Sequence, residues 1–136
     1  SYAPLARLVD ARGRVSGGAP PVLLEAREVY LGLAHVKDSK RTPELTGTKH
    51  MVYRHLFYAF EARPPFQLVA ASEPFLLPRA ADAEPASALP TVQFASGMVV
   101  DEGRDTVLIS HSELDCGAAL TQFSLSVVLE ELGLVR

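Results

Sequence analysis

Apolar and polar residues alternate in short blocks along this chain, and the apolar blocks have the length and residue types of β-strands. Stretches rich in β-branched, aromatic and aliphatic residues occur at residues 22–24, 29–36, 51–60, 67–71, 92–100, 106–111 and 117–125. Glycine, proline or charged residues separate most of them, as expected for strands bounded by turns. The pattern predicts seven strands.

One strand-turn-strand unit occurs twice. Residues 23–35 read LLEAREVYLGLAH and residues 99–111 read VVDEGRDTVLISH, so each unit places a charged turn between two apolar strands. We expect His35 and His111 to end the second strand of their units. Repetition of such a unit within β-rich sequence is typical of a radially repeated sheet such as a propeller.

The strands group into two successive antiparallel sheets, which predicts an all-β fold. They are assigned to about two four-stranded antiparallel blades, with four strands located at about residues 16–77 and three at about residues 91–125. Residues 16–21 (SGGAPP) are predicted to form a tight turn leading into the strand at residues 22–24. Proline suits this position because it cannot donate a hydrogen bond to a β-ladder. The polar residues 37–49 and the Ala/Pro-rich residues 78–90 are predicted connections. Residues 126–132 separate apolar side chains from two glutamates, which predicts a short C-terminal helix.

Two sheets alone leave edges without partners. Propellers need about four blades or more to close a ring, so one interpretation is part of a larger propeller completed by further blades or another protomer. The other interpretation is a compact sandwich of two sheets. Exposed edges predict self-association or aggregation of the chain on its own.

The composition and net charge limit the classes of partner that the chain is expected to bind. The 136 residues are 48% hydrophobic, enough to form the core of one domain. A net charge of −3 argues against a nucleic-acid partner, which requires a basic face. No apolar run approaches the roughly 18 residues that a membrane span requires. The single cysteine, Cys116, excludes an internal disulfide framework and leaves the compartment open.

Several local patterns together resemble a known group of proteins. They are SGGAP at 16–20, VYLGLAH at 29–35, YRHLF at 53–57, PPF at 64–66, SEPF at 72–75, QFASGM at 93–98 and ISHSELD at 109–115. These patterns are similar to the five-bladed β-propellers of carbohydrate-active enzymes, most closely the mannoside phosphorylase family of glycoside hydrolases. The resemblance covers most of residues 12–132.

The resemblance implies a C-terminal portion of a five-bladed propeller with a carbohydrate ligand. It implies no cofactor, with inorganic phosphate as the co-substrate if the bond is phosphorolysed. The family's general-acid aspartate lies upstream of this chain, so whether a bond is hydrolysed, phosphorolysed or formed stays open. The alternative is a non-catalytic carbohydrate-binding or scaffolding propeller, or one associated with a glycosyltransferase.

Two histidines and an aspartate are candidate sugar contacts. His35 and His111 can each donate to one sugar hydroxyl and accept from another, or be satisfied by a loop carbonyl. Asp115 matches the family's aspartate that contacts the sugar beside the scissile bond, and it also suits a turn before Gly117. Asp38, the corresponding acid of the first unit, reads as a solvated loop residue.

The strand at residues 51–60 supplies further candidates. Tyr53 and His55 share one face and Arg54 takes the other, because side chains alternate along a strand. The match to the family favours Tyr53 and His55 as sugar contacts, whereas an aromatic strand also suits a core. Arg54 and Lys37 are predicted phosphate contacts, since phosphate must be held by cations. The four histidines lack metal-ligand spacing, and no metal is predicted.

Overall fold

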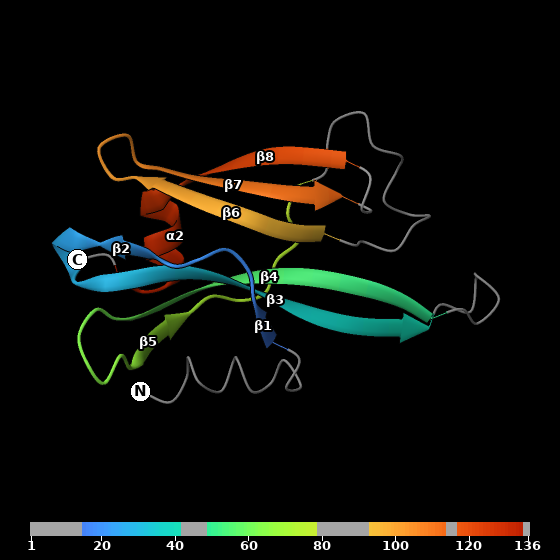
Figure 1. Ribbon diagram of the computed structural model, residues 1–136, viewed down its shortest axis with the longest axis horizontal. Helices are drawn as coiled ribbons and strands as arrows, with labels where there is room; N and C mark the ends of the chain where they lie inside the picture. Colours follow the sequence, from blue (N-terminus) through green and yellow to red (C-terminus); the bar gives the residue numbers. More distant parts are fainter. Residues whose placement is uncertain (1–14, 42–48, 79–92, 114–116, 135–136) are drawn as a thin grey trace.

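The protein is mostly β, with two antiparallel sheets and one short C-terminal helix in a computed structural model (Figure 1). The structure describes residues 15–41, 49–78, 93–113 and 117–134. Within these ranges no helix is long and apolar enough to cross a membrane.

The first sheet has five strands built around one long hairpin. Its strands are β1 (Val15–Gly17), β2 (Val22–Leu24), β3 (Val29–Arg41), β4 (Lys49–Glu61) and β5 (Leu68–Ala71), with the 3₁₀ turn η1 (Glu25–Arg27) between β2 and β3. Both β1 and β2 pair with β3, and β3 pairs with β4 along its full length. The β3–β4 hairpin extends beyond the second sheet (Figure 1).

The second sheet has three strands in sequence order and leads into the helix. They are β6 (Gln93–Asp101), β7 (Thr106–Glu113) and β8 (Gly117–Ser124), followed by α2 (Leu125–Glu131). A β-bulge interrupts β6, because Ala95 pairs with His111 whereas Gly97 pairs with Ser110. The extra residue, Ser96, shifts the inward-facing positions from odd to even numbers, so that Ala95 and Met98 both reach the core.

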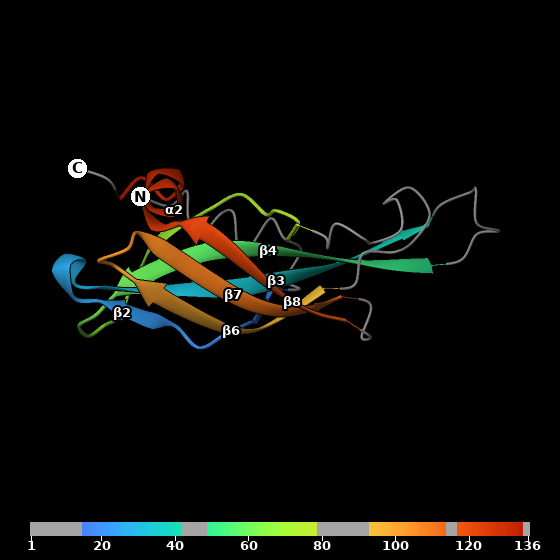
Figure 2. The ribbon, with the colours of Figure 1, turned by 90° about the horizontal axis from the view of Figure 1, so that it is seen from above.

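The core lies between the two stacked sheets, and α2 packs at one end of it (Figures 1 and 2). The sheets contribute alternate residues of their strands, as expected for face-to-face packing. These core residues include Leu31, Leu33, Phe57, Ala59, Met98, Val107 and Ile109, joined by Leu125, Val128 and Leu129 of α2. The Phe57 ring stacks on Phe75 at 5.2 Å and meets the edge of Phe123 at 5.6 Å, which links β4 to β8.

A glycine on β3 provides space for a cross-strand aromatic ring. Gly32 pairs with Tyr58 of β4, and a Cβ at position 32 would collide with the Tyr58 ring. Close packing of this kind requires glycine opposite the ring. Burial raises the pKa of Tyr58, which forms part of a small cluster on the outer face with Ala34, Val36 and Leu56.

The turn between β6 and β7 is tied to the start of α2 by one carboxylate. Asp105 has a left-handed backbone (φ 53°), and its Oδ1 accepts from the Ser126 N–H at 2.7 Å and the Ser126 hydroxyl at 2.6 Å. The Ser124 hydroxyl donates to Asp105 Oδ2 at 2.7 Å and also accepts from the Val127 N–H as the N-cap of α2. These hydrogen bonds, those of Ser126 first, lower the pKa of Asp105.

The seven predicted strands and the C-terminal helix are confirmed, with three corrections. The structure adds the short strand β1 within the predicted entry segment, so the first sheet contains five strands rather than four. The second sheet has the three strands that the pattern predicts, and neither sheet is the four-stranded sheet of a complete blade. The predicted loop at residues 37–49 is too long, because β3 continues to Arg41 and β4 begins at Lys49. Main-chain hydrogen bonds extend the hairpin through polar residues, since the ladder does not depend on apolar side chains.

Candidate functional site

Three histidines face one another between the two sheets. His35 of β3 and His55 of β4 are direct cross-strand partners on the inner face, with ring centroids 6.3 Å apart. His111 of β7 approaches from the second sheet, close enough that its positive charge would lower the pKa of His55. These three residues are called the histidine cluster below.

The histidines lie within strands. β3 continues past His35 to Arg41, and β7 continues past His111 to Glu113. The prediction that each histidine ends its strand is therefore wrong. The reason is the same ladder extension through polar residues that lengthens the β3–β4 hairpin.

His55 is the most enclosed member of the histidine cluster. Its side chain is fully buried (0% exposed), and neither ring nitrogen has a hydrogen-bond partner among the described residues. Burial, followed by the charges of His35 and His111, lowers the pKa of His55 to about 4. Burial also lowers the pKa of His35. The His55 imidazole is therefore neutral at pH 7, because the positive form is excluded from this environment.

His111 is held from within the second sheet. Its Nε2 lies 2.7 Å from the hydroxyl of Thr121 on β8, and the residue is 2% exposed. The His111 side chain is therefore almost wholly enclosed. The structure thus places His55 and His111 in the interior, while His35 is partly exposed.

Two aromatic residues and a lysine lie beside the partly exposed end of the histidine cluster, next to His35. Phe94 of β6 packs against His35 at 5.3 Å and Tyr53 at 4.8 Å. The Lys37 Nζ lies 6.0 Å from the centre of the Tyr53 ring, within cation–π range. Arg54 is paired with Val36 and takes the opposite face of the same sheet. The structure therefore brings Tyr53, His55 and Lys37 to one face and does not bring Arg54 to them.

Of the two candidate aspartates, the structure describes the backbone of Asp38 and does not describe Asp115. Asp38 is paired with Val52 within the β3–β4 ladder, rather than in the predicted loop. Asp115 lies outside the described residues. Its assignment as a sugar contact stays a prediction from the resemblance.

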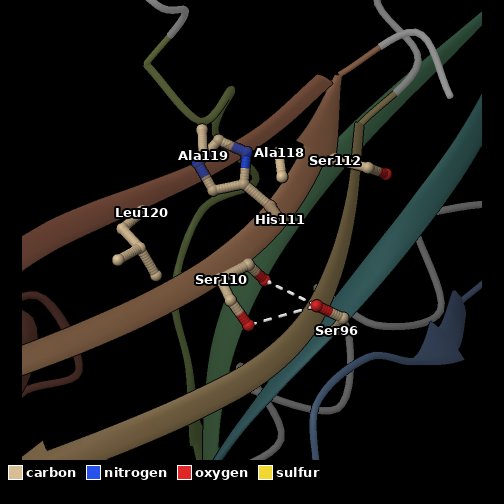
Figure 3. Close-up of a pocket in the computed structure, with 7 residues that line it drawn as sticks. All are labelled: Ser96, Ser110, His111, Ser112, Ala118, Ala119 and Leu120. Atoms are coloured by element: carbon tan, nitrogen blue, oxygen red, sulfur yellow. Dashed lines mark hydrogen bonds between the residues drawn. The ribbon is translucent and has the colours of Figure 1, made fainter. Parts of the chain in front are cut away.

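A separate pocket of about 510 Å³ lies against the three-stranded sheet (Figure 3). It is lined by Ser96, Ser110, His111, Ser112, Ala118, Ala119 and Leu120. The Ser96 hydroxyl lies 3.1 Å from the Ser110 hydroxyl and donates to the Ser110 carbonyl at 3.3 Å. Leu120 is 69% exposed beside them. The pocket combines hydroxyl groups with a small apolar surface.

The sequence contains a signal for this pocket that the titratable residues alone do not reveal. Ser110 and Ser112 flank His111, and Ala118 and Leu120 alternate with inward-facing positions of β8. Neighbouring side chains on a strand point to opposite faces. Because His111 faces the core, the serines on either side of it face outward. Alternation along β7 therefore indicates a hydroxyl-lined face opposite His111.

Within the described ranges, no group of three or more His, Cys, Asp or Glu residues is placed to hold a metal ion. The histidine cluster thus combines the buried His55 and His111 with the partly exposed His35, and the serine-lined pocket is an accessible polar feature of the second sheet. Comparison with protein-family models, curated proteins and solved structures finds no match to this chain.

Proposed function

We propose that the chain binds carbohydrate as part of a carbohydrate-active β-propeller resembling the mannoside phosphorylases. The observation that carries the proposal is the pocket on β6–β8, where three serines stand beside Ala118 and Leu120. Each serine hydroxyl both donates and accepts a hydrogen bond, as each sugar hydroxyl does. The apolar side chains suit the C–H surface of a pyranose ring.

The dimensions of the pocket support a small ligand. Its volume of about 510 Å³ lies within the range of roughly 300–1,000 Å³ typical of small-molecule sites. The Ser96–Ser110 contact orders two hydroxyls before a ligand arrives. A sugar hydroxyl that takes over this contact exchanges one hydrogen bond for another at little cost.

The architecture supports the propeller part of the proposal at a coarser level. Propeller blades are antiparallel sheets, and the chain forms two antiparallel sheets with a common core, an arrangement that a two-sheet sandwich shares. In a propeller the remaining blades or another protomer supply the rest of the site, including the family's acid. Since Lys37 and Arg54 lie on opposite faces, the proposal covers sugar contacts and assigns no phosphate site.

The test is to titrate the 136-residue chain with mannose, mannose 1-phosphate and short mannosides, and to measure the changes in its NMR chemical shifts. We expect shifts at β6–β8 and a dissociation constant raised about tenfold or more in the double variant Ser110→Ala/Ser112→Ala, since each lost hydrogen bond contributes about 1 kcal/mol. Gln122→Ala, on the same face outside the pocket, is the control and should bind normally. Absence of shifts with every ligand, or undiminished binding by the double variant, overturns the proposal.

A further inference from the structure

The described strands at sheet edges differ in how well they are protected from pairing. β1 and β2 have three residues each and β5 has four. β6 is longer, but it carries the bulge at Ser96 and ends at Asp101. Short, bulged or charged edges resist pairing with another strand. β8 has none of these protections.

β8 is an eight-residue strand of sequence GAALTQFS, without charge or proline. It pairs with β7 without a register shift from Gly117↔Glu113 to Ser124↔Thr106. In the described part of the chain no strand pairs with its other side. The free edge of β8 is therefore long, regular and uncharged. Leu120, near the middle of the strand, has an exposed side chain.

The ladder shows which backbone groups of β8 face that edge. The Leu125 N–H donates to the Asp105 carbonyl at 3.0 Å, one position beyond the Ser124↔Thr106 pair. Hydrogen-bonded positions alternate along an antiparallel strand, so odd-numbered residues of β8 bond to β7. The N–H and C=O groups of Ala118, Leu120 and Gln122 therefore point outward.

We propose that β8 pairs with β8 of a second copy of this chain, antiparallel about a two-fold axis at Leu120. In this register Leu120 faces its own mate and Ala118 faces Gln122 of the partner subunit, so all outward-facing backbone groups of the three residues pair. About this two-fold axis a charge at position 120 would face the same charge on the copy, and charges beside it would lie close to their copies. The charge-free edge of β8 avoids this repulsion, and the paired strands form one six-stranded sheet.

The proposed pairing is argued from the backbone edge of β8 and does not require that the chain bind sugar. It buries a narrow strip, and interfaces of this size are weak. We therefore expect a concentration-dependent dimer. Because Leu120 also lines the serine pocket, the axis places two copies of the pocket side by side on one face.

Sedimentation velocity of the full chain, without sugar and over a wide concentration range, tests the pairing. The weight-average mass should rise from 14.7 kDa towards twice that value. Leu120→Lys should raise the dimer dissociation constant at least about tenfold, since like charges directly opposite each other destabilise a strand pair. Val99→Lys on β6, which also replaces an exposed apolar residue (65% exposed) on the outer face, should leave the dimer unchanged.

A charge-pairing experiment tests the register. Leu120→Lys and Leu120→Glu variants should each be monomeric, and an equimolar mixture should dimerise because position 120 faces position 120 across the axis. Gln122→Pro removes an outward N–H without removing a bond to β7, and it should also weaken the dimer. A monomeric wild-type chain, equal disruption by Val99→Lys, or no association in the mixture of correctly folded variants overturns the proposal.

Discussion

His55 shows how strongly position determines the chemistry of a single side chain. On an exposed strand its imidazole would titrate near pH 6.5. Between two sheets, with His35 and His111 nearby and no hydrogen-bond partner in the described chain, it is held neutral. A buried polar group without a partner costs about 1–3 kcal/mol. His55 is thus a cost to stability that grows as the pH falls.

The pH dependence of unfolding should reveal this cost. The pKa of His55 is about 4 in the folded state and 6.5 in the unfolded state, so the unfolded state binds more protons between these values. Stability is therefore complete above pH 6.5 and is lost as the pH falls towards 4, by up to about 3 kcal/mol. His55→Leu should flatten this loss and preserve stability at pH 7, as measured by urea unfolding across that pH range.

His35→Leu is the matched control for His55→Leu. His35 belongs to the same cluster but is partly exposed, so its replacement should flatten the pH profile less. An unchanged slope in His55→Leu would show that the loss of stability arises elsewhere.

The junction between the second sheet and α2 depends on one turn residue. Asp105 accepts from both Ser124 and Ser126 and holds the start of the helix against the β6–β7 turn. Asp105→Gly retains the left-handed backbone, because glycine adopts it readily, but removes all three side-chain hydrogen bonds. We expect a decrease of several degrees in Tm, measured by circular dichroism.

Glu102→Gly in the same exposed turn is the control for Asp105→Gly. It adds the same backbone freedom to the unfolded chain without touching α2. Equal Tm values for the two variants would refute the role of Asp105. Because its pKa is lowered in the folded state, the contribution of Asp105 is present at neutral pH and is lost as the pH falls through that lowered pKa.

Strand and helix positions were predictable because they rest on local periodicity, whereas pairing and burial were not. The apolar alternation at residues 106–111 located β7, but the extension of β3 through Lys37 depends on the strand beside it. Likewise, the enclosure of His111 depends on a sheet far away in sequence. The candidate histidines were therefore found as residues, while their inward direction and the outward serines required the packed structure.

The two sheets are joined by a side-chain amide as well as by apolar contact. Gln93 of β6 is 1% exposed; its Oε1 accepts from the Leu77 N–H at 3.0 Å and its Nε2 donates to the Leu77 carbonyl at 2.8 Å. Two residues earlier, Phe75 exchanges backbone hydrogen bonds with His55 of β4. The segment after β5 is thereby held to both sheets.

Removing this amide should weaken the whole fold. Gln93→Leu leaves a buried N–H and a buried C=O of Leu77 without partners, which should cost on the order of 2–4 kcal/mol. Denaturant unfolding provides the measurement, and Gln67→Leu at an exposed position is the control. A variant as stable as the control would indicate that apolar packing alone joins the sheets.

The bulge at Ser96 makes the number of residues in β6 matter as much as their identity. On one side of it Gln93 reaches Leu77, and on the other side Met98 reaches the core. A strand one residue shorter would keep every apolar residue yet turn one of these two groups towards solvent. A chain whose β6 lacks this bulge would therefore align with this one only with a single-residue gap at position 96, even where the flanking residues look alike.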